Sequence, residues 1–376
     1  MLYLDITLEM IIDQLSEDDL LVDIYQLENG SYGIVLLGED ILIKRVIALD
    51  KHYISLINML DSYKDKNHLY ICPDGALYNV SFERYIDGFE ISYLSSPKSL
   101  LRKKDQRLNN EDIVSFVCPD FNDDYNDDQR SGVGILYGSY LEGKFMNDIY
   151  KENCHLYSYK EANHDNFINI RNPKVLHVST HGQYIEDETY ELMDRGRLLL
   201  AGYNIENKND GYVTAGEIQD MNLNDTDLVV LSACNTGIGE SVSGEGIYGI
   251  RRAFELAGAK TLLLTVEEID DLNSAIFMNV FYQFYNKRKQ IYESFKEARE
   301  YLKDIKNSMK ELKGYKEKFK QEMEGKIGTR SKKNYLKEID QRIRESENRG
   351  YIVKKKGREY IKEDWKGFII QGRIDI

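Results

Sequence analysis

The sequence predicts an α/β chain built on a mostly parallel sheet flanked by helices. Short, largely apolar runs at 113–118, 175–179, 228–232 and 261–266 alternate with stretches of helical spacing. Such runs are typical of parallel strands that are buried on both faces and joined by helical crossovers. Apolar residues make up 42% of the 376 residues and only 4 are proline, which supports a folded core and argues against a disordered chain.

Residues 1–112 predict a smaller α/β unit that precedes the main domain. A short helix at 7–15 is followed by β-rich runs at 20–27, 32–37 and 41–49. Asn29-Gly30 separates the first two runs and predicts a hairpin turn, because both residues tolerate positive φ. A helix at 52–63 and a strand at 68–72 complete this N-terminal unit.

Residues 113–376 predict the main domain, with a helix at 138–151 and a closing strand within 365–372. Residues 301–350 interrupt it with a charged stretch whose apolar residues recur at spacings of three, four or seven. This narrow stripe predicts a protruding two-helix hairpin. Residues 284–376 carry 27 basic and 16 acidic side chains, a net charge of +11, which leaves −25 for residues 1–283.

Charge and cysteine usage exclude several classes of protein. The overall net charge of −14 disfavours general binding to nucleic acid or to an anionic membrane, so we expect neither as a partner. The four cysteines lie far apart, and the first residues lack the basic start and apolar run of a signal peptide, which predicts a reducing, cytoplasmic compartment. No stretch approaches the roughly 20 apolar residues of a membrane-spanning helix.

Two reactive side chains follow predicted strands at their carboxyl ends, where the reactive residues of such folds lie. His181 and Gly182 follow the strand at 175–179, and Cys234 follows the strand at 228–232. A thiol with a pKa of about 8.5 is a good nucleophile when an imidazole takes its proton. The N–H groups of Gly182 and Cys234 are suited to hold an oxyanion. The alternative is a buried apolar cysteine and a structural histidine.

Other candidate sites have weaker support. The glycine-rich stretch at 237–244 lacks the spacing of a phosphate-binding loop, and Asp120, Asn122 and Asp124 lack the glycine and the closing glutamate of a calcium loop. We therefore expect no metal and no cofactor. The remaining histidines are interpreted as structural. They are His52, His68, His155, His164 and His177.

Several blocks of the sequence resemble CHAT-domain proteases, which belong with caspases, separases and gingipains among cysteine proteases of the caspase fold. The blocks are VLHVSTHG at 175–182, DLVVLSACNTG at 227–237, GEGIYGIRRAF at 244–254, AGAK at 257–260, PDGAL at 73–77 and the closing strand at 365–372. The resemblance covers nearly the whole chain except 301–350. It implies a caspase-like fold with His181 as general base, Cys234 as nucleophile and no third, acidic member.

The chain departs from the family pattern after the strand at 261–266. Relatives usually carry a serine-leucine-tryptophan run there, in a segment that lines the specificity pocket, whereas this chain has acidic residues. These candidates for the specificity pocket are Glu267, Glu268, Asp270 and Asp271. A carboxylate in that pocket would pair with Lys or Arg of a substrate, and the alternative is a solvated acidic loop.

The resemblance implies a cysteine endopeptidase that cleaves a protein substrate. Bacterial relatives act in regulated defence or cell-death systems, so we expect a partner-regulated effector, with the basic hairpin at 301–350 as the docking surface for a regulatory protein partner. The helical repeats that precede the domain in many relatives are not visible in this sequence. Two alternatives remain open: a catalytically silent caspase-fold binding or scaffold module, and an acyl-transfer enzyme acting on small molecules.

Overall fold

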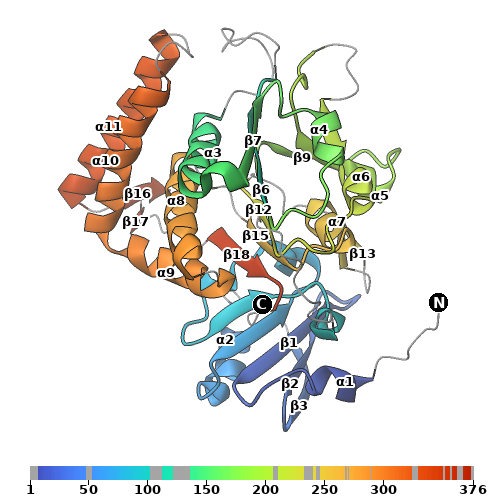
Figure 1. The fold of residues 1–376 in the computed structure, drawn as a ribbon. Helices are drawn as coiled ribbons and strands as arrows, with labels where there is room; N and C mark the ends of the chain where they lie inside the picture. The colour runs from blue at the N-terminus through green and yellow to red at the C-terminus, as the bar shows by residue number, and fades with distance from the viewer. Residues whose placement is uncertain are drawn as a thin grey trace.

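One large mixed sheet runs through the computed structural model of the chain (Figure 1). The structure describes residues 7–47, 53–101, 112–121, 136–205, 211–232, 240–242, 246–266, 269, 271–288, 290–323, 329–349, 352–355, 358–361 and 367–373. Within these residues the sheet has 11 strands. Their spatial order is β3 (Ile41–Ile47), β2 (Tyr32–Gly38), β1 (Asp19–Gln26), β4 (His68–Cys72), β5 (Glu90–Tyr93), β18 (Phe368–Gln371), β15 (Thr261–Thr265), β12 (Leu228–Leu231), β8 (Val175–Ser179), β6 (Ile113–Pro119) and β7 (Cys154–Tyr159).

Most neighbouring strands of this sheet are parallel, as the apolar runs predicted. β15, β12, β8, β6 and β7 form one parallel block, and β1, β4, β5 and β18 form a second. The expected strands at 113–118, 175–179, 228–232 and 261–266 are all present within one or two residues. The α/β class with a mostly parallel sheet is therefore confirmed.

The hairpin between β1 and β2 turns at Asn29-Gly30, as expected. Gly30 has a φ of +79°, a conformation that glycine adopts without steric cost. The Asn29 side-chain oxygen accepts a hydrogen bond from the Ser31 N–H at 3.0 Å. These local interactions fix the register in which β1 pairs antiparallel with β2.

The closing strand β18 joins the N-terminal strands to the main parallel block. It pairs antiparallel with β15, with Ile370 opposite Leu263, and parallel with β5, with Gln371 opposite Tyr93. The strands on both sides of the predicted boundary at residue 112 thus share one sheet. The division into residues 1–112 and 113–376 stays a prediction.

Helices cover both faces of the parallel block (Figure 1). On one face, the side chains of Val175, Val230 and Leu263 share a core with the longer helices, and on the other Leu176 and Val178 share a core with the shorter ones. The first group comprises α3 (Tyr137–Tyr150), α8 (Asp271–Arg288), α9 (Ile291–Lys303) and α10 (Ile305–Glu322). The second comprises α4 (His164–Ile168), α6 (Ala215–Gln219) and α7 (Ile250–Leu256).

The charged stretch at 301–350 forms the predicted pair of helices, α10 and α11 (Thr329–Arg349). They extend along one side of the molecule, beyond α3 (Figure 1). Their apolar stripe also packs against the domain, because Leu312, Phe319 and Met323 are buried in the core that α3 and α8 share. An ion pair between Lys318 and Asp148 of α3 adds to this contact. The hairpin is therefore anchored at the domain as well as projecting from it.

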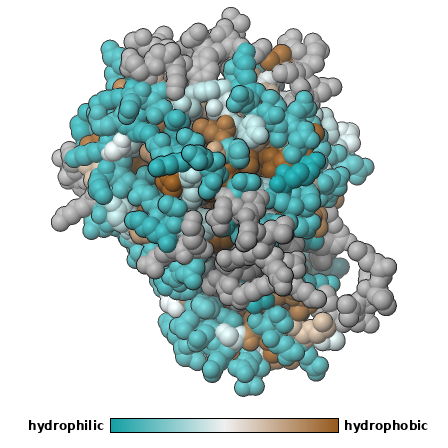
Figure 2. Space-filling model, viewed as in Figure 1, coloured by the Kyte–Doolittle hydropathy of each residue, from teal (hydrophilic) through white to brown (hydrophobic). Residues whose placement is uncertain are grey.

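The remaining described elements are short. Small sheets are formed by β9 (Gly182–Tyr184), β10 (Gly196–Leu199) and β11 (Tyr212–Thr214), by β13 (Glu240–Val242) and β14 (Gly246–Tyr248), and by β16 (Ile352–Lys355) and β17 (Arg358–Ile361). The short helices are α1 (Leu8–Ile12), α2 (Ile54–Leu60) and α5 (Leu192–Arg195). Figure 2 shows a largely hydrophilic surface on this side, with apolar groups gathered in hollows of its upper part.

Candidate active site

The two strands that lead to His181 and Cys234 lie side by side in the sheet. β8 and β12 are parallel, with Val178 opposite Leu231. The Ser232 N–H continues this pairing by donating to the Val178 carbonyl at 2.9 Å. Ser179 and Ser232 therefore end the two strands at the same edge, where reactive residues of parallel sheets gather.

A separate three-stranded sheet holds the backbone around His181. β9, which begins at Gly182, pairs antiparallel with β10. The His181 carbonyl accepts the Leu199 N–H at 2.9 Å, and the Thr180 hydroxyl donates to the Leu199 carbonyl at 2.5 Å. These bonds leave the His181 side chain half-buried, with its ring 5.5 Å from the ring of Phe121.

His181 opens onto a cavity of ≈60 Å³ at the carboxyl ends of the strands. Residues that follow β8 and β12, one residue of β15 and the start of α8 meet there. Its lining consists of Leu136, Thr180, His181, Ser232, Thr265, Ile269, Asp271 and Ser274.

Asp271 is the one proposed specificity residue whose surroundings the structure describes. It begins α8, and its carboxylate accepts the N–H groups of Gly138 at 2.6 Å and Ser139 at 3.1 Å, which belong to the first turn of α3. A carboxylate at a helix N-terminus satisfies free N–H groups and interacts favourably with the helix dipole. The Tyr335 hydroxyl of α11 donates to the same carboxylate at 3.3 Å.

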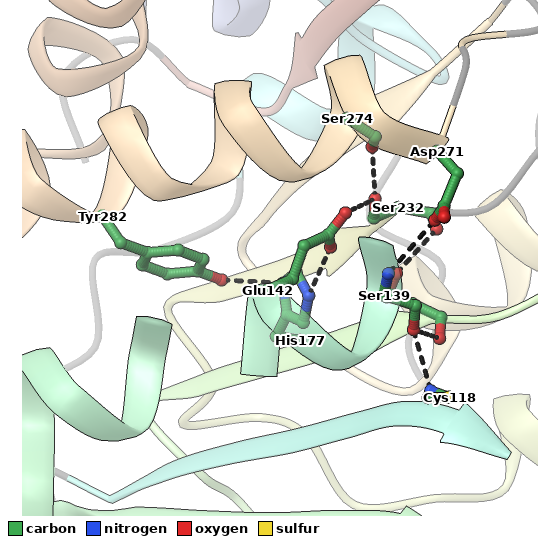
Figure 3. Close-up of polar contacts among 9 residues, drawn as sticks. Cys118, Ser139, Glu142, His177, Ser232, Asp271, Ser274 and Tyr282 are labelled. Carbon is green, nitrogen blue, oxygen red and sulfur yellow. Dashed lines mark hydrogen bonds and ion pairs between the residues drawn. The ribbon is translucent and has the colours of Figure 1, made fainter. Parts of the chain in front are cut away.

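A buried polar network lies beneath the cavity (Figure 3). Glu142 of α3 and His177 of β8 are 1% and 0% exposed, and they are joined by an Oε2···Nε2 contact of 2.9 Å. The other carboxylate oxygen of Glu142 accepts the Ser232 hydroxyl at 3.0 Å, and Ser232 contacts the Ser274 hydroxyl at 2.6 Å. Nδ1 of His177 lies 3.0 Å from the Tyr282 hydroxyl. The network thus connects α3 and α8 to the end of β12.

A second group of bonds ties α3 to the end of β8 (Figure 3). The Ser139 hydroxyl donates to the Ser179 carbonyl at 2.6 Å and accepts the Cys118 N–H at 2.8 Å. The Ser179 hydroxyl in turn lies 3.3 Å from the Ser232 carbonyl. Both strand ends are consequently held by side chains and not only by the sheet.

Several predicted site residues lie outside the described residues. They are Cys234, Glu267, Glu268 and Asp270, together with Asn122 and Asp124 of the rejected calcium motif and most of the stretch at 237–244. Of the predicted set, the structure brings His181 and Asp271 to one cavity, and Gly182 follows His181 at the start of β9. The roles assigned to all of these residues, including the N–H of Gly182 as an oxyanion donor, stay predictions.

The other three cysteines are buried in the fold. Burial raises the pKa of the Cys154 thiol to about 11, and burial raises the pKa of Cys72 well above its usual value. Cys118 is 0% exposed at the end of β6. A buried thiol of raised pKa is a poor nucleophile.

A larger hollow of ≈790 Å³ lies between the N-terminal strands and α9. His68, Glu90 and Lys296 are among the residues that line it. His68 binds Asp19 at 2.8 Å and lies 3.5 Å from Glu90, which also pairs with Lys296. The hydrogen bonds to Asp19 and Glu90 raise the pKa of His68 to about 10, so its imidazole is charged at neutral pH. The hollow is the place where these ion pairs lie, and it is separate from the carboxyl ends of β8 and β12.

The described residues contain no group of three or more His, Cys, Asp or Glu side chains arranged to hold a metal ion. A search of the same residues for a helix long and apolar enough to cross a membrane found none.

Sequence reasoning missed the residues beneath the cavity. His177 was assigned to packing inside its strand, which its burial confirms, but its partner Glu142 was not identified. A signal existed: Glu142 lies four residues after Gly138 and shares a helix face with it, next to the buried Ser139. A carboxylate among small buried residues on a core-facing helix requires a polar partner.

Comparison with known proteins gives one family and two structural likenesses. The model of the CHAT domain family matches residues 43–372. Two crystal structures of the Saccharomyces cerevisiae separase–securin complex, at 3.0 and 2.6 Å resolution, are similar with TM-scores of 0.42 and 0.41 and 14% identity in each case. The likeness covers 66% and 65% of this chain but only 15% and 16% of those chains. No curated protein matches.

Proposed function

Because the chain belongs to the CHAT domain family, we propose that it is a cysteine endopeptidase in which His181 and Cys234 cleave a protein substrate. The observation that carries the proposal is the family match, since it spans both strand-end blocks. The cavity beside His181 supports it. Ser179 and Ser232 end neighbouring strands, and His181 and Cys234 each follow their serine by two residues.

In the proposed reaction the Cys234 thiolate, whose proton His181 has taken, attacks the carbonyl carbon of the scissile peptide bond. The oxygen gains negative charge and accepts hydrogen bonds from the N–H groups of Gly182 and Cys234. His181 then protonates the departing amine as the C–N bond breaks, leaving a thioester. Water deprotonated by His181 hydrolyses the thioester and releases the free thiol.

The environments of the other cysteines support Cys234 as the nucleophile. Cys72, Cys118 and Cys154 are all buried, so none of them offers a thiolate to a peptide substrate. Their surroundings also make them suitable controls for chemical labelling, because a modest excess of a thiol reagent should leave them unmodified.

The acidic side chains of Glu267, Glu268 and Asp270 are proposed to select a basic residue before the cleaved bond. A carboxylate in a specificity pocket forms charge-assisted hydrogen bonds with Lys or Arg. We expect peptides with arginine at that position to be cleaved at least about tenfold faster than matched peptides with glutamine, since tenfold corresponds to about 1.4 kcal/mol. The measurement is kcat/KM over a fluorogenic peptide series, together with site mapping of a thiol-reactive peptidyl ketone probe that carries arginine.

Replacing Glu267, Glu268 and Asp270 by their amides should remove this preference. Glu188→Gln, which changes an exposed carboxylate in another loop, is the control. A preference for aspartate or a large apolar residue would contradict the specificity proposal alone. Absence of both cleavage and labelling at Cys234 would instead contradict the peptidase and favour a catalytically silent binding module.

We also propose that a partner protein regulates cleavage through the hairpin of α10 and α11, within a bacterial defence or cell-death response. The hairpin is anchored on α3, which the hydrogen bonds of Gly138 and Ser139 connect to the cavity. Lys333, Lys337 and Arg344 of α11 are exposed, and such cations suit an acidic partner. The chain alone should therefore be weakly active.

Replacement of residues 303–349 by a short Gly-Ser linker tests this role of the hairpin. We expect the basal kcat to fall at least about tenfold, because the linker removes contacts that hold α3. Circular dichroism must show that the helices and sheet outside the hairpin persist, since Leu312 and Phe319 leave a core face uncovered. A folded linker variant with the basal rate of the intact chain would end the regulatory proposal.

A further inference from the structure

Three helices meet at the carboxylate of Asp271. Asp271 begins α8 and lines the cavity with His181. Its oxygens accept the N–H groups of Gly138 and Ser139 in the first turn of α3, and the Tyr335 hydroxyl of α11 donates to Oδ2. An ionised carboxylate has about four acceptor sites, so most of its capacity is used within the protein.

The sequence is adapted to this close contact. A Cβ atom at Gly138 would lie 2.5 Å from the main-chain oxygen of Asp271 and 2.6 Å from its carboxylate. Any other residue at 138 would therefore push α3 away from α8. The glycine allows the two helix starts to touch, and the carboxylate then satisfies N–H groups that no residue of α3 itself can satisfy.

The position of α3 is transmitted to the strand that carries His181. The Ser139 hydroxyl donates to the Ser179 carbonyl at 2.6 Å, two residues before His181. One bond thus connects Asp271 to Ser139, and the next connects Ser139 to the end of β8 (Figure 3).

Tyr335 brings the hairpin into this chain of contacts. Its hydroxyl lies 3.0 Å from the Tyr315 hydroxyl of α10. Its ring lies 4.6 Å from that of Phe319 and 5.4 Å from that of Tyr137, the first residue of α3. A displacement of the hairpin must therefore move the hydroxyl that binds Asp271 or the ring that packs on α3.

We propose that Asp271 is a positioning residue that sets the start of α3 and thereby the geometry of His181, and that Tyr335 makes this setting depend on the hairpin. The inference deepens the proposed regulation and rests on it. It assigns Asp271 to the scaffold of the site, whereas the acidic run before it remains the proposed specificity element. A regulatory partner would act by shifting the Tyr335–Asp271 contact.

Tyr335→Phe tests the contact directly, because it removes the hydroxyl and keeps the ring. The matched control is Tyr301→Phe, whose hydroxyl donates to Glu311 at 3.0 Å and does not bind Asp271. We expect Tyr335→Phe to accelerate hydrogen exchange at the Gly138 and Ser139 amides and to lower kcat about three- to tenfold at unchanged KM. Asp271→Asn should have the same effects, larger in size, and Tyr301→Phe should show neither.

Each contrary outcome identifies what fails. If Tyr335→Phe and Tyr301→Phe behave alike in exchange and in kcat, the hairpin does not set the site. If Asp271→Asn raises KM for arginine peptides and leaves kcat and amide exchange unchanged, Asp271 is a specificity carboxylate and the inference is wrong. If the wild-type chain cleaves no peptide, the proposed function fails, while amide exchange at Gly138 and Ser139 still decides whether the coupling exists.

Discussion

Cys234→Ala and His181→Ala are each expected to lower kcat by at least about a thousandfold, since loss of one member of a nucleophile–base pair removes most of the rate enhancement. Peptide cleavage by the purified variants, measured against the intact chain, checks this expectation. Neither variant should unfold, because both residues come just after strands in the sequence, and the side chain of His181 is only half-buried.

Matched controls separate catalysis from general damage. Cys154→Ala removes a buried thiol whose pKa is raised to about 11. His164→Gln changes a histidine that does not line the cavity and that pairs with Glu217 at a distance of 2.8 Å. Both should retain cleavage. Retained cleavage by Cys234→Ala would end the assignment of the nucleophile, whereas retained cleavage by His181→Ala alone would leave the thiol in place and require another base.

The central strands could be predicted from the sequence because each is a short, largely apolar run with turn residues at both ends. β8 and β12 follow this rule, and the residues beyond them were identified as site candidates for that reason. The three-residue strands β9 and β11 carry too few residues for a periodicity, so the small sheet behind His181 was not predicted. β7 was missed as well, because most of its residues are only partly buried and the run is not continuously apolar.

Contacts between residues far apart in the sequence limited what could be predicted of the site. Tyr335 and Asp271 are 64 positions apart and lie on different helices, so neither helical periodicity nor strand alternation relates them. The same holds for the pairing of β18 with β5, which joins Gln371 to Tyr93. Such contacts depend on how complete elements pack, and one sequence shows only the local pattern of each element.

Breaking the buried contact between Glu142 and His177 is expected to cost about 1–3 kcal/mol of the free energy of unfolding, because the remaining partner loses a hydrogen-bond counterpart in a buried site. Glu142→Ala also removes the carboxylate that accepts the Ser232 hydroxyl. The measurement is the shift of the midpoint of urea unfolding, monitored by circular dichroism, and it reports stability when the m-value stays constant. Glu217→Gln is the matched control, since its contact with His164 is partly exposed and should change stability by less than about 1 kcal/mol.

The double replacement Glu142→Met with His177→Leu distinguishes a pair from two independent residues. An apolar pair of similar volume removes both buried polar groups together, so its cost should be well below the sum of the single losses measured for Glu142→Met and His177→Leu. Additive losses would show that the two side chains do not act as a unit. In the double variant Ser232, which precedes Cys234 by two residues, loses its bond to Glu142. A stable double variant with reduced kcat would therefore indicate that the network orients the end of β12.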